Sequence, residues 1–369
     1  MSTPNPYEKN TSTEVAFIGA VKALSLFHYK KSGFYKKLID RAGYDLNKIV
    51  TIQDLEALPV ITTDFIKQYS DSPELLSIPK EEIYLNLTSS GTTGQKSQIF
   101  FDKRSIEWPQ EILDEIFQHY GWISENPAQY LLFTYETEPQ SKLGTAYTDN
   151  YLCKYAPVHS SFSALRMKGD GGHEFDSFGT IDTLHRYEKE GMPVRIFGFP
   201  SFMWFTLKRM KALGLKPLKL HKDSFCFFGG GWKGHASEEI SKRELYEAIH
   251  EMLGIPRERI RDGYGSVEHC IPYVECENHN FHIPTWSHVV IRNLKNLEPV
   301  GYREKGFLSF ISPYITSMPF HSVMSSDLAS VHRHEECGCG TKTDFFVVYG
   351  RAGTSQSKSC AVSASELLV

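Results

Sequence analysis

The spacing of apolar residues along the chain changes near residue 83. Before that point, segments such as FYKKLIDRAGYD and TIQDLEALPVITTDFIKQY carry apolar residues at the three- to four-residue spacing of a helix face. Thr51 and Thr63 stand where two of these helices would begin, and a threonine hydroxyl can accept a hydrogen bond from a free N–H of the first turn. The pattern therefore predicts a helical N-terminal part over residues 1–82.

From residue 83 onward, short apolar runs alternate with longer helical stretches. The runs that we predict as strands are IYLNL, QIFF, YLLFTY, VRIFGF, DSFCFFG, GFLSFI and FFVVYG. The helical stretches include SFMWFTLKRMKALG and SEEISKRELYEAIHEMLG. Strands that alternate with helices predict an α/β fold with mostly parallel sheets. After FFVVYGR the apolar periodicity weakens, so residues 350–369 are expected to form a hinge remnant and a mobile tail.

Composition and charge exclude several classes of partner. The chain has 369 residues, and 40 basic residues stand against 44 acidic ones, for a formal net charge of −4. This balance gives no reason to expect a nucleic acid or an anionic membrane as partner. MSTPNPYEKN does not have the pattern of a secretory leader, and no apolar run is long enough to span a membrane. Seven cysteines in such a chain indicate reduced thiols or metal ligands, and hence a cytoplasmic protein.

The segment LNLTSSGTTGQKSQIFF, residues 85–101, is the best candidate for a phosphate-binding loop. Glycines let backbone N–H groups converge on an anion, hydroxyls donate further hydrogen bonds, and Lys96 supplies a positive charge. The loop is not a Walker loop, because Gln95 precedes the lysine and a strand-like run follows it. The residues of the predicted phosphate loop are Thr88, Ser89, Ser90, Gly91, Thr92, Thr93, Gly94 and Lys96. A polar hairpin turn without a ligand is the alternative.

Four further motifs follow this loop along the chain: FFGGGWKG, DGYGSVEHC, MSSDLA and YGRAG. Together with the loop, and in the same order, they resemble the motifs of the adenylate-forming enzymes, the acyl-CoA synthetase and luciferase-like superfamily. The first motif then corresponds to TSGTTGxPK, with Gln95-Lys96 in place of Pro-Lys, and Val267 stands where Thr or Ser is common. The resemblance implies an adenylate-forming catalytic domain over residues 1–349, with the small C-terminal domain truncated to a short tail.

The chemistry of adenylation suggests a role for each matching residue. Lys96 and the loop would hold the pyrophosphate end of ATP, and Glu268 is the expected carboxylate for Mg²⁺, a cation that prefers oxygen ligands. Asp327 would accept hydrogen bonds from the ribose hydroxyls, and Arg351 would contact phosphate or ribose. The remaining residues that the resemblance places at the nucleotide are Gly229, Gly230, Gly231, Tyr264, Gly265 and Ser266.

Cys360 lies in the serine-rich tail SQSKSCAVSASELL. An acyl adenylate reacts readily with a thiolate, so a tail cysteine could accept the acyl group, and Lys358 nearby would favour the thiolate. We therefore predict that Cys360 is catalytic, together with Lys96 and Glu268. An inert exposed thiol is the alternative.

This combination of motifs and tail resembles the acyl-protein synthetase subunits of bacterial bioluminescence fatty-acid reductase complexes. The resemblance implies ATP-dependent activation of a long-chain fatty acid and transfer of the acyl group to the tail cysteine. It also implies an acyl-accepting reductase subunit, which makes the aldehyde, and an acyl-transferase subunit as partners. Two alternatives are an acyl-CoA ligase of the phenylacetate-CoA-ligase type and a non-enzymatic subunit that binds acyl adenylate and regulates a partner.

A second group of candidate ligands lies in VECENHNFHIP and HRHEECGCG. Cys276, His282, Cys337 and Cys339 supply four ligands, enough for a closed tetrahedral zinc site. Related phenylacetate-CoA-ligase-like proteins carry a similar arrangement. The spare candidates are His279, Cys270, His332 and His334. A structural zinc site and a plain Cys-x-Cys loop stay open at this point.

Overall fold

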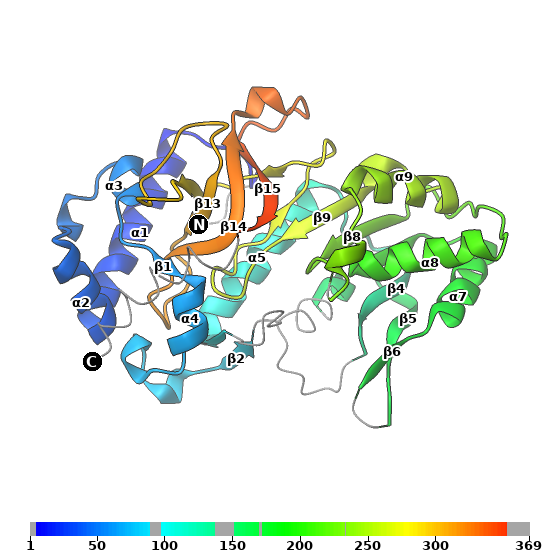
Figure 1. The fold of residues 1–369 in the computed structure, drawn as a ribbon, viewed down its shortest axis with the longest axis horizontal. Coiled ribbons are helices and arrows are strands. Elements are labelled where there is room, and N and C mark those ends of the chain that lie inside the picture. Colours follow the sequence, from blue (N-terminus) through cyan, green and yellow to red (C-terminus); the bar gives the residue numbers. More distant parts are fainter. Residues whose placement is uncertain (1–4, 89–96, 137–150, 170–171, 233, 353–369) are drawn as a thin grey trace. The chain divides into compact units, whose positions relative to one another are not determined.

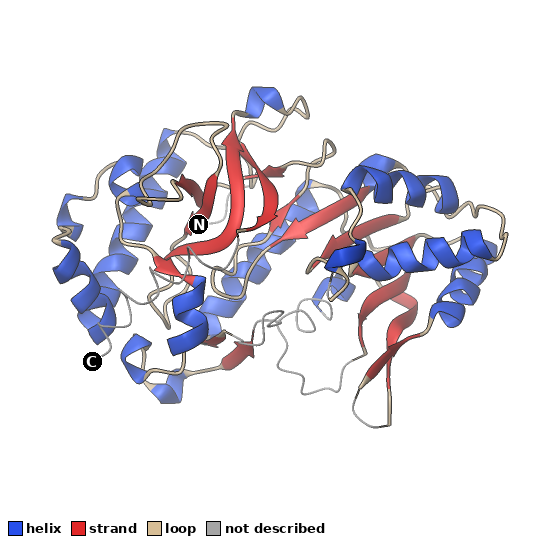
Figure 2. Ribbon diagram, in the orientation of Figure 1, coloured by secondary structure: helices blue, strands red, loops and turns tan. Residues whose placement is uncertain are grey.

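The computed structural model describes residues 5–88, 97–136, 151–169, 172–232 and 234–352. Chain contacts divide the protein into two compact units. The first unit contains Met1–His119, Gly265–Tyr273 and Asn280–Val369, and the second contains Tyr120–Tyr264 and Val274–His279. Both units combine helices with strands, which confirms the predicted mixed α/β class (Figures 1 and 2).

In the described part of the first unit, four α-helices lie within the predicted helical part over residues 1–82, and a fifth follows β3 (Gln98–Phe101). They are α1 (Thr11–Lys31), α2 (Gly33–Ala42), α3 (Ile52–Glu56), α4 (Thr63–Tyr69) and α5 (Lys103–His119). Thr51 caps α3 through a hydrogen bond from the amide of Asp54, as predicted. The cap predicted at Thr63 is wrong by one residue, because the hydroxyl of Thr62 accepts the hydrogen bond from Phe65.

The main sheet of the first unit has six strands and is largely antiparallel. Its order is β11 (Phe281–His282), β15 (Phe345–Arg351), β14 (Ser322–His332), β13 (Gly306–Ile311) and β12 (His288–Arg292), with β1 (Ile61–Thr62) parallel to β14. Residues of α1, α2 and α3 form a buried cluster with Val290 of β12 and Ile311 of β13. The expectation of mostly parallel sheets is therefore wrong for this sheet. The connections between β12, β13, β14 and β15 contain no α-helix, the usual crossover between parallel neighbours, and the chain returns antiparallel.

The sheet of the second unit matches the prediction of parallel strands. Its order is β10 (Tyr273–Val274), β9 (Ile260–Tyr264), β8 (Phe225–Gly229), β7 (Val194–Gly198), β4 (Ala128–Tyr135), β5 (Val158–Met167) and β6 (His173–Phe175). The pairs from β5 through β9 are parallel, and β6 is antiparallel to β5. The helices that pack on this sheet are α7 (Ser177–Glu190), α8 (Pro200–Ala212) and α9 (Lys242–Leu253) (Figure 1).

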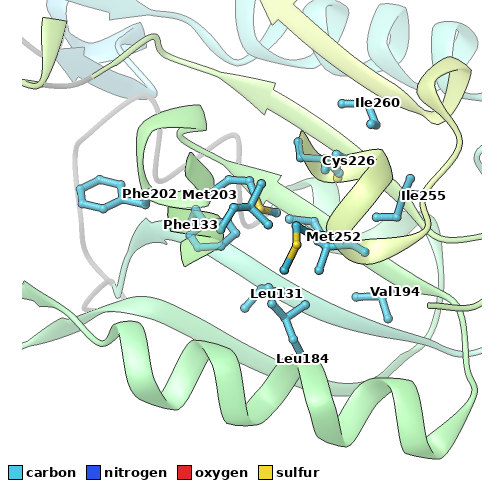
Figure 3. Close-up of a cluster of buried hydrophobic side chains, with 14 of the residues drawn as sticks. Leu131, Phe133, Leu184, Val194, Phe202, Met203, Cys226, Met252, Ile255 and Ile260 are labelled. Carbon is cyan, nitrogen blue, oxygen red and sulfur yellow. The ribbon is translucent and has the colours of Figure 1, made fainter. Parts of the chain in front are cut away.

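Apolar side chains of the strands and helices form the core of the second unit. Leu131 of β4 and Cys226 of β8 lie in one cluster with Leu184, Met203 and Met252 of the three helices (Figure 3). Complete burial of one such side chain contributes about 1.5–3 kcal/mol. The core thus holds β7, β8 and β9 in place, and the candidate residues follow at their carboxyl ends.

Short 3-10 turns connect several of these elements. They are Leu46–Lys48, Pro73–Leu75, Lys80–Glu82, Cys153–Tyr155, Ala236–Glu238, Arg257–Arg259 and His334–Glu336. None of the helices in the described ranges combines the length and the hydropathy that crossing a membrane requires. The boundary predicted between residues 349 and 350 stays a prediction, because residues 353–369 lie outside the described ranges.

Two histidines are fully buried side by side in the first unit. The rings of His28 and His321 stack with their centroids 5.1 Å apart. His28 bonds to Ser77 through Nδ1, at 2.7 Å, and His321 Nε2 lies 3.0 Å from the hydroxyls of both Ser25 and Tyr35. Burial lowers the pKa of His28 to about 3, although a hydrogen bond to a backbone carbonyl opposes the shift. Burial, and secondarily His28, lowers the pKa of His321 well below its usual range.

Both imidazoles are therefore neutral in the folded protein, and we predict a loss of stability in mild acid. Between about pH 6.5 and pH 3 the unfolded chain binds protons that the folded chain does not, so the free energy of unfolding falls as pH falls. One such histidine lowers it by about 1 kcal/mol between pH 6 and pH 5. The free energy of unfolding is measured by urea titration at pH 6 and at pH 5. Its decrease between the two pH values should be smaller by this amount in His28→Gln than in the wild type. The exposed His159→Gln is the control, and an unchanged decrease in His28→Gln would contradict the assignment.

Candidate functional site

The predicted phosphate loop connects two antiparallel strands. Strand β2 (Leu85–Thr88) ends at the first loop residue, and β3 (Gln98–Phe101) begins two residues after Lys96. Thr88 pairs with Gln98 at the base of the loop. This confirms the predicted strands on both sides, and with them the distinction from a Walker loop, in which a helix follows the lysine.

Glu268 lies in a tight turn of the first unit, close to that base. The carboxylate is 4% exposed, and its Oε1 accepts a short hydrogen bond from the hydroxyl of Ser97, which is fully buried. The carbonyl of Ser266 accepts hydrogen bonds from the amides of His269 (3.2 Å) and Cys270 (2.8 Å), which closes the turn. Cys270 has a φ of 64°, a left-handed conformation that is uncommon for a residue with a side chain.

A buried histidine fixes this turn from the other side. His269 Nε2 lies 2.9 Å from the Tyr273 hydroxyl, and its ring stacks on Phe310 with the centroids 4.5 Å apart. Burial lowers the pKa of His269 to about 3, so a neutral ring follows Glu268 in the chain. Among the described residues, Glu268 Oε2 has no hydrogen-bond partner. The carboxylate therefore fits a hard cation such as Mg²⁺, which takes oxygen ligands.

Asp327 and Arg351 are directly opposite each other on β14 and β15. Arg351 Nε lies 3.8 Å from Asp327 Oδ1, and the side chains are 57% and 22% exposed. The backbone amide of Asp327 donates to the Ser325 hydroxyl at 3.1 Å. An accessible acceptor beside a guanidinium suits a ligand that carries both hydroxyl groups and negative charge.

The second unit brings the other two candidate segments together. Gly229 ends β8, Tyr264 ends the neighbouring β9, and Gly229 pairs with Gly263. Gly230 and Gly231 follow with φ values of 74° and 66°, which glycine adopts without strain. Both segments thus lie at the carboxyl ends of parallel strands, where open α/β sheets bind ligands. Tyr264 and Gly265 are consecutive, so one chain segment carries candidates from both units.

The sequence reasoning missed a charge network around the buried Glu275, close to Tyr264. Lys242 Nζ lies 2.6 Å from Asp262 Oδ2 and 2.8 Å from Glu275 Oε1. The Tyr246 hydroxyl donates to Glu275 Oε2 at 2.9 Å. Burial alone would raise the pKa of Glu275, but the charge of Lys242 holds it below its usual value. The network fixes the end of β9, and the charged pattern of SEEISKRELYE gave no sign of it, because such a pattern usually marks an exposed helix face.

The four predicted zinc ligands come together. One ligand atom from each of Cys276, His282, Cys337 and Cys339 lies within 4.8 Å of the other three. A tetrahedral zinc with Zn–S bonds of about 2.3 Å places its sulfurs about 3.8 Å apart, so this spacing is close to that of a closed site. The spare candidates Cys270, His279, His332 and His334 are not in the group.

Hydrogen bonds with neighbouring groups orient two of these candidate ligands, His282 and Cys337. His282 Nδ1 lies 2.5 Å from the carbonyl oxygen of Thr343, so Nδ1 carries the proton and Nε2 has the free lone pair. Cys339 Sγ lies 3.2 Å from that Nε2, and the Asn280 amide donates to Cys337 Sγ, also at 3.2 Å. This donor set fits zinc, and four protein ligands indicate a structural site.

Several candidates cannot be placed. Ser89, Ser90, Gly91, Thr92, Thr93, Gly94, Lys96, Lys358 and Cys360 lie outside the described residues. Ser97 is the site residue that sequence reasoning missed on the phosphate loop, although its position directly after the closing lysine was a usable signal.

Comparison with known proteins identifies the family. Residues 6–369 match the family model described as acyl-protein synthetase, LuxE. The chain belongs to this family. Members of the acyl-protein synthetase family are ligases, and this chain is therefore a ligase. It is 23% identical to the long-chain-fatty-acid–luciferin-component ligase of Vibrio harveyi, over 94% of this chain and 86% of that protein. The corresponding ligase of Aliivibrio fischeri is 22% identical, over 94% and 87%.

Other relatives connect the acyl-protein synthetase family to coenzyme A ligases. A phenylacetate-coenzyme A ligase of Thermus thermophilus is 30% identical over 87% of this chain and 66% of its own length. A solved structure of 2-hydroxyisobutyryl-CoA ligase in the postadenylation state has a TM-score of 0.70 at 14% identity, and covers 95% of this chain and 71% of that one. The fold is therefore that of adenylate-forming ligases, as the motifs indicated.

The ligand cluster predicts that the purified protein contains about one zinc ion per chain. Replacing Cys339 by Ala should remove the zinc and lower the thermal unfolding midpoint, because closed zinc sites contribute directly to folding free energy. Metal analysis and a thermal scan with and without a chelator check this. Cys153→Ser, outside the cluster, is the control. The site would be contradicted if the wild type, purified in zinc-supplemented buffer, contained no metal and had the same unfolding midpoint with and without the chelator.

Proposed function

We propose that this chain activates a long-chain fatty acid with ATP, takes the acyl group onto Cys360, and passes it to a reductase subunit. The reductase then produces the fatty aldehyde used in bioluminescence. The observation that carries the proposal is the family match over residues 6–369. The names of the two ligases from luminous bacteria support the fatty-acid substrate.

In the first step, the fatty-acid carboxylate attacks the α-phosphorus of ATP, acyl-AMP forms, and pyrophosphate leaves. Lys96 and the N–H groups of the loop would stabilise the charge on the departing phosphates. Glu268 would hold Mg²⁺, which supplies further neutralisation of the phosphate charge. The buried position of the carboxylate and its hydrogen bond to Ser97 support this role.

Two groups of candidate residues would contact the nucleoside part of ATP. Asp327 would accept from the ribose hydroxyls, and Arg351, 3.8 Å from it, would contact a phosphate or the same ribose. Gly229, Gly230, Gly231, Tyr264, Gly265 and Ser266 would line the adenine and acyl groups. The positive φ values at two of the glycines support a close approach of the backbone to a ligand.

In the second step, the Cys360 thiolate attacks the acyl carbonyl, the thioester bond forms, and AMP leaves. Lys358 would favour the thiolate. A cysteine of the reductase subunit would then take the acyl group by thioester exchange, and an acyl-transferase subunit would supply the fatty acid. The long-chain fatty acid and these two subunits are the proposed partners.

Incubation with ATP, Mg²⁺ and labelled tetradecanoic acid should give a hydroxylamine-labile adduct on Cys360, detected by mass spectrometry of the intact and digested chain. Cys360→Ser should lose the adduct and keep fatty-acid-dependent ATP–pyrophosphate exchange. Cys153→Ser is the matched control and should keep both. Exchange without any adduct in the wild type, with no reductase present, would overturn self-acylation.

Replacing Lys96 by Ala should reduce the rate of ATP–pyrophosphate exchange by about a hundredfold. A positive charge that stabilises the negative charge developing on the departing phosphates in the transition state contributes on this scale. The control is Lys103→Ala, an exposed lysine seven positions further along the chain that pairs with Glu107 at 3.5 Å. Equal activity of the two variants would remove Lys96 from the proposed site.

A coenzyme A ligase is the second candidate, favoured by the 30% identity to the Thermus enzyme. It requires AMP release that depends on coenzyme A and is unchanged by Cys360→Ser. The same variant therefore separates the two functions.

A further inference from the structure

The hydrogen bond between Ser97 and Glu268 joins two segments that are 171 positions apart in the sequence. Ser97 stands between the closing lysine of the phosphate loop and the first residue of β3. Glu268 is the candidate cation ligand. Both residues belong to the first unit, and both are buried, at 0% and 4% exposure.

The direction of this hydrogen bond follows from chemistry. An ionised carboxylate can only accept, so the Ser97 hydroxyl donates to Oε1. In a buried setting, water does not readily replace a lost donor, and hydrogen bonds to charged groups are stronger than neutral ones. The bond fixes the rotation of the carboxylate and leaves Oε2 for another ligand.

Both partners are held by separate contacts. On one side, the pairing of Thr88 with Gln98 sets the register of the loop, and the Gln98 amide donates to the Ser70 hydroxyl at 3.0 Å. On the other side, the turn around Glu268 is closed by backbone bonds to Ser266 and by the Cys270 thiol, which donates to the Val267 carbonyl at 3.1 Å. The hydroxyl therefore connects two ordered segments at a defined point.

We propose that Ser97 is a positioning residue that holds the Glu268 carboxylate in place for the cation of the metal–ATP complex. It fixes this carboxylate relative to the start of β3. The inference rests on the proposed function, in which Glu268 binds that cation. Ser97 itself contacts neither the cation nor the substrate.

The test measures binding of the preformed Mn²⁺–ATP complex to the full chain, by isothermal titration calorimetry without fatty acid. Ser97→Ala should weaken binding about tenfold, the lower end of the effect of removing a residue that supports a metal ligand. Ser97→Thr keeps the hydroxyl and should bind within about twofold of the wild type. Ser309→Ala removes another fully buried serine hydroxyl of the first unit, which donates to the Val323 carbonyl at 3.1 Å, and should leave binding unchanged.

A double-mutant cycle separates positioning from a general loss of structure. Glu268→Gln should weaken binding at least as much as Ser97→Ala, and the double variant should bind no more weakly than Glu268→Gln alone, because the serine acts through the carboxylate. Thermal unfolding checks that each variant is folded. Additive effects of the two substitutions, or wild-type binding by Ser97→Ala, would overturn the inference, as would failure of the wild type to bind Mn²⁺–ATP.

Failure of the proposed function gives a different result. Suppose that the wild type binds Mn²⁺–ATP and the double-mutant cycle gives the predicted result, but no fatty acid supports ATP–pyrophosphate exchange. This outcome contradicts the fatty-acid substrate and leaves the role of Ser97 intact. Conversely, normal exchange together with unaltered binding by Glu268→Gln leaves fatty-acid activation intact and removes the inference about Ser97.

Discussion

The need of buried polar atoms for hydrogen-bond partners determines how distant segments of this chain are joined. His28 and Ser77, Glu268 and Ser97, and Glu275 and Lys242 are each hydrogen-bonded pairs from separate parts of the sequence. In each case at least one polar side chain is fully or nearly fully buried, and its partner comes from another segment. An unpaired polar group in such a position costs about 1–3 kcal/mol, so these contacts select one arrangement of the chain over others that bury the same apolar surface.

The elements whose pattern is local were predictable from the sequence. The strands QIFF and GFLSFI coincide with β3 and β13, and Thr51 caps the helix that it was predicted to cap. The helix predicted over SEEISKRELYEAIHEMLG begins only at Lys242, because Ser241 caps it and accepts a hydrogen bond from Glu244. The direction of strand pairing was not predictable for the first unit. Apolar runs look alike in parallel and antiparallel sheets when both faces are covered.

The residues of the candidate site also fall into two groups, those that a local sequence pattern indicates and those that depend on a distant partner. Glu268, Asp327 and the glycines after β8 became candidates because they lie in short motifs, and the candidate zinc ligands because their residue types are rare. Ser97 and the network of Lys242, Asp262 and Glu275 were missed, because residue type alone does not mark a serine or a charged residue as part of a site until its partner is known. Long-range pairs of ordinary residues are therefore the part of the site that a single sequence does not reveal.

The β14–β15 hairpin carries two kinds of candidate at opposite ends. Cys337 and Cys339 lie in the loop that joins the strands, whereas Asp327 and Arg351 face each other away from that loop. A chimera that exchanged residues 322–351 with a relative would therefore move the proposed ribose contacts together with two of the four candidate metal ligands. Such an exchange can succeed only when the recipient supplies the counterparts of Cys276 and His282 in matching register. If both proposed roles hold, the proposed nucleotide contacts of this hairpin cannot be exchanged independently of its candidate metal ligands.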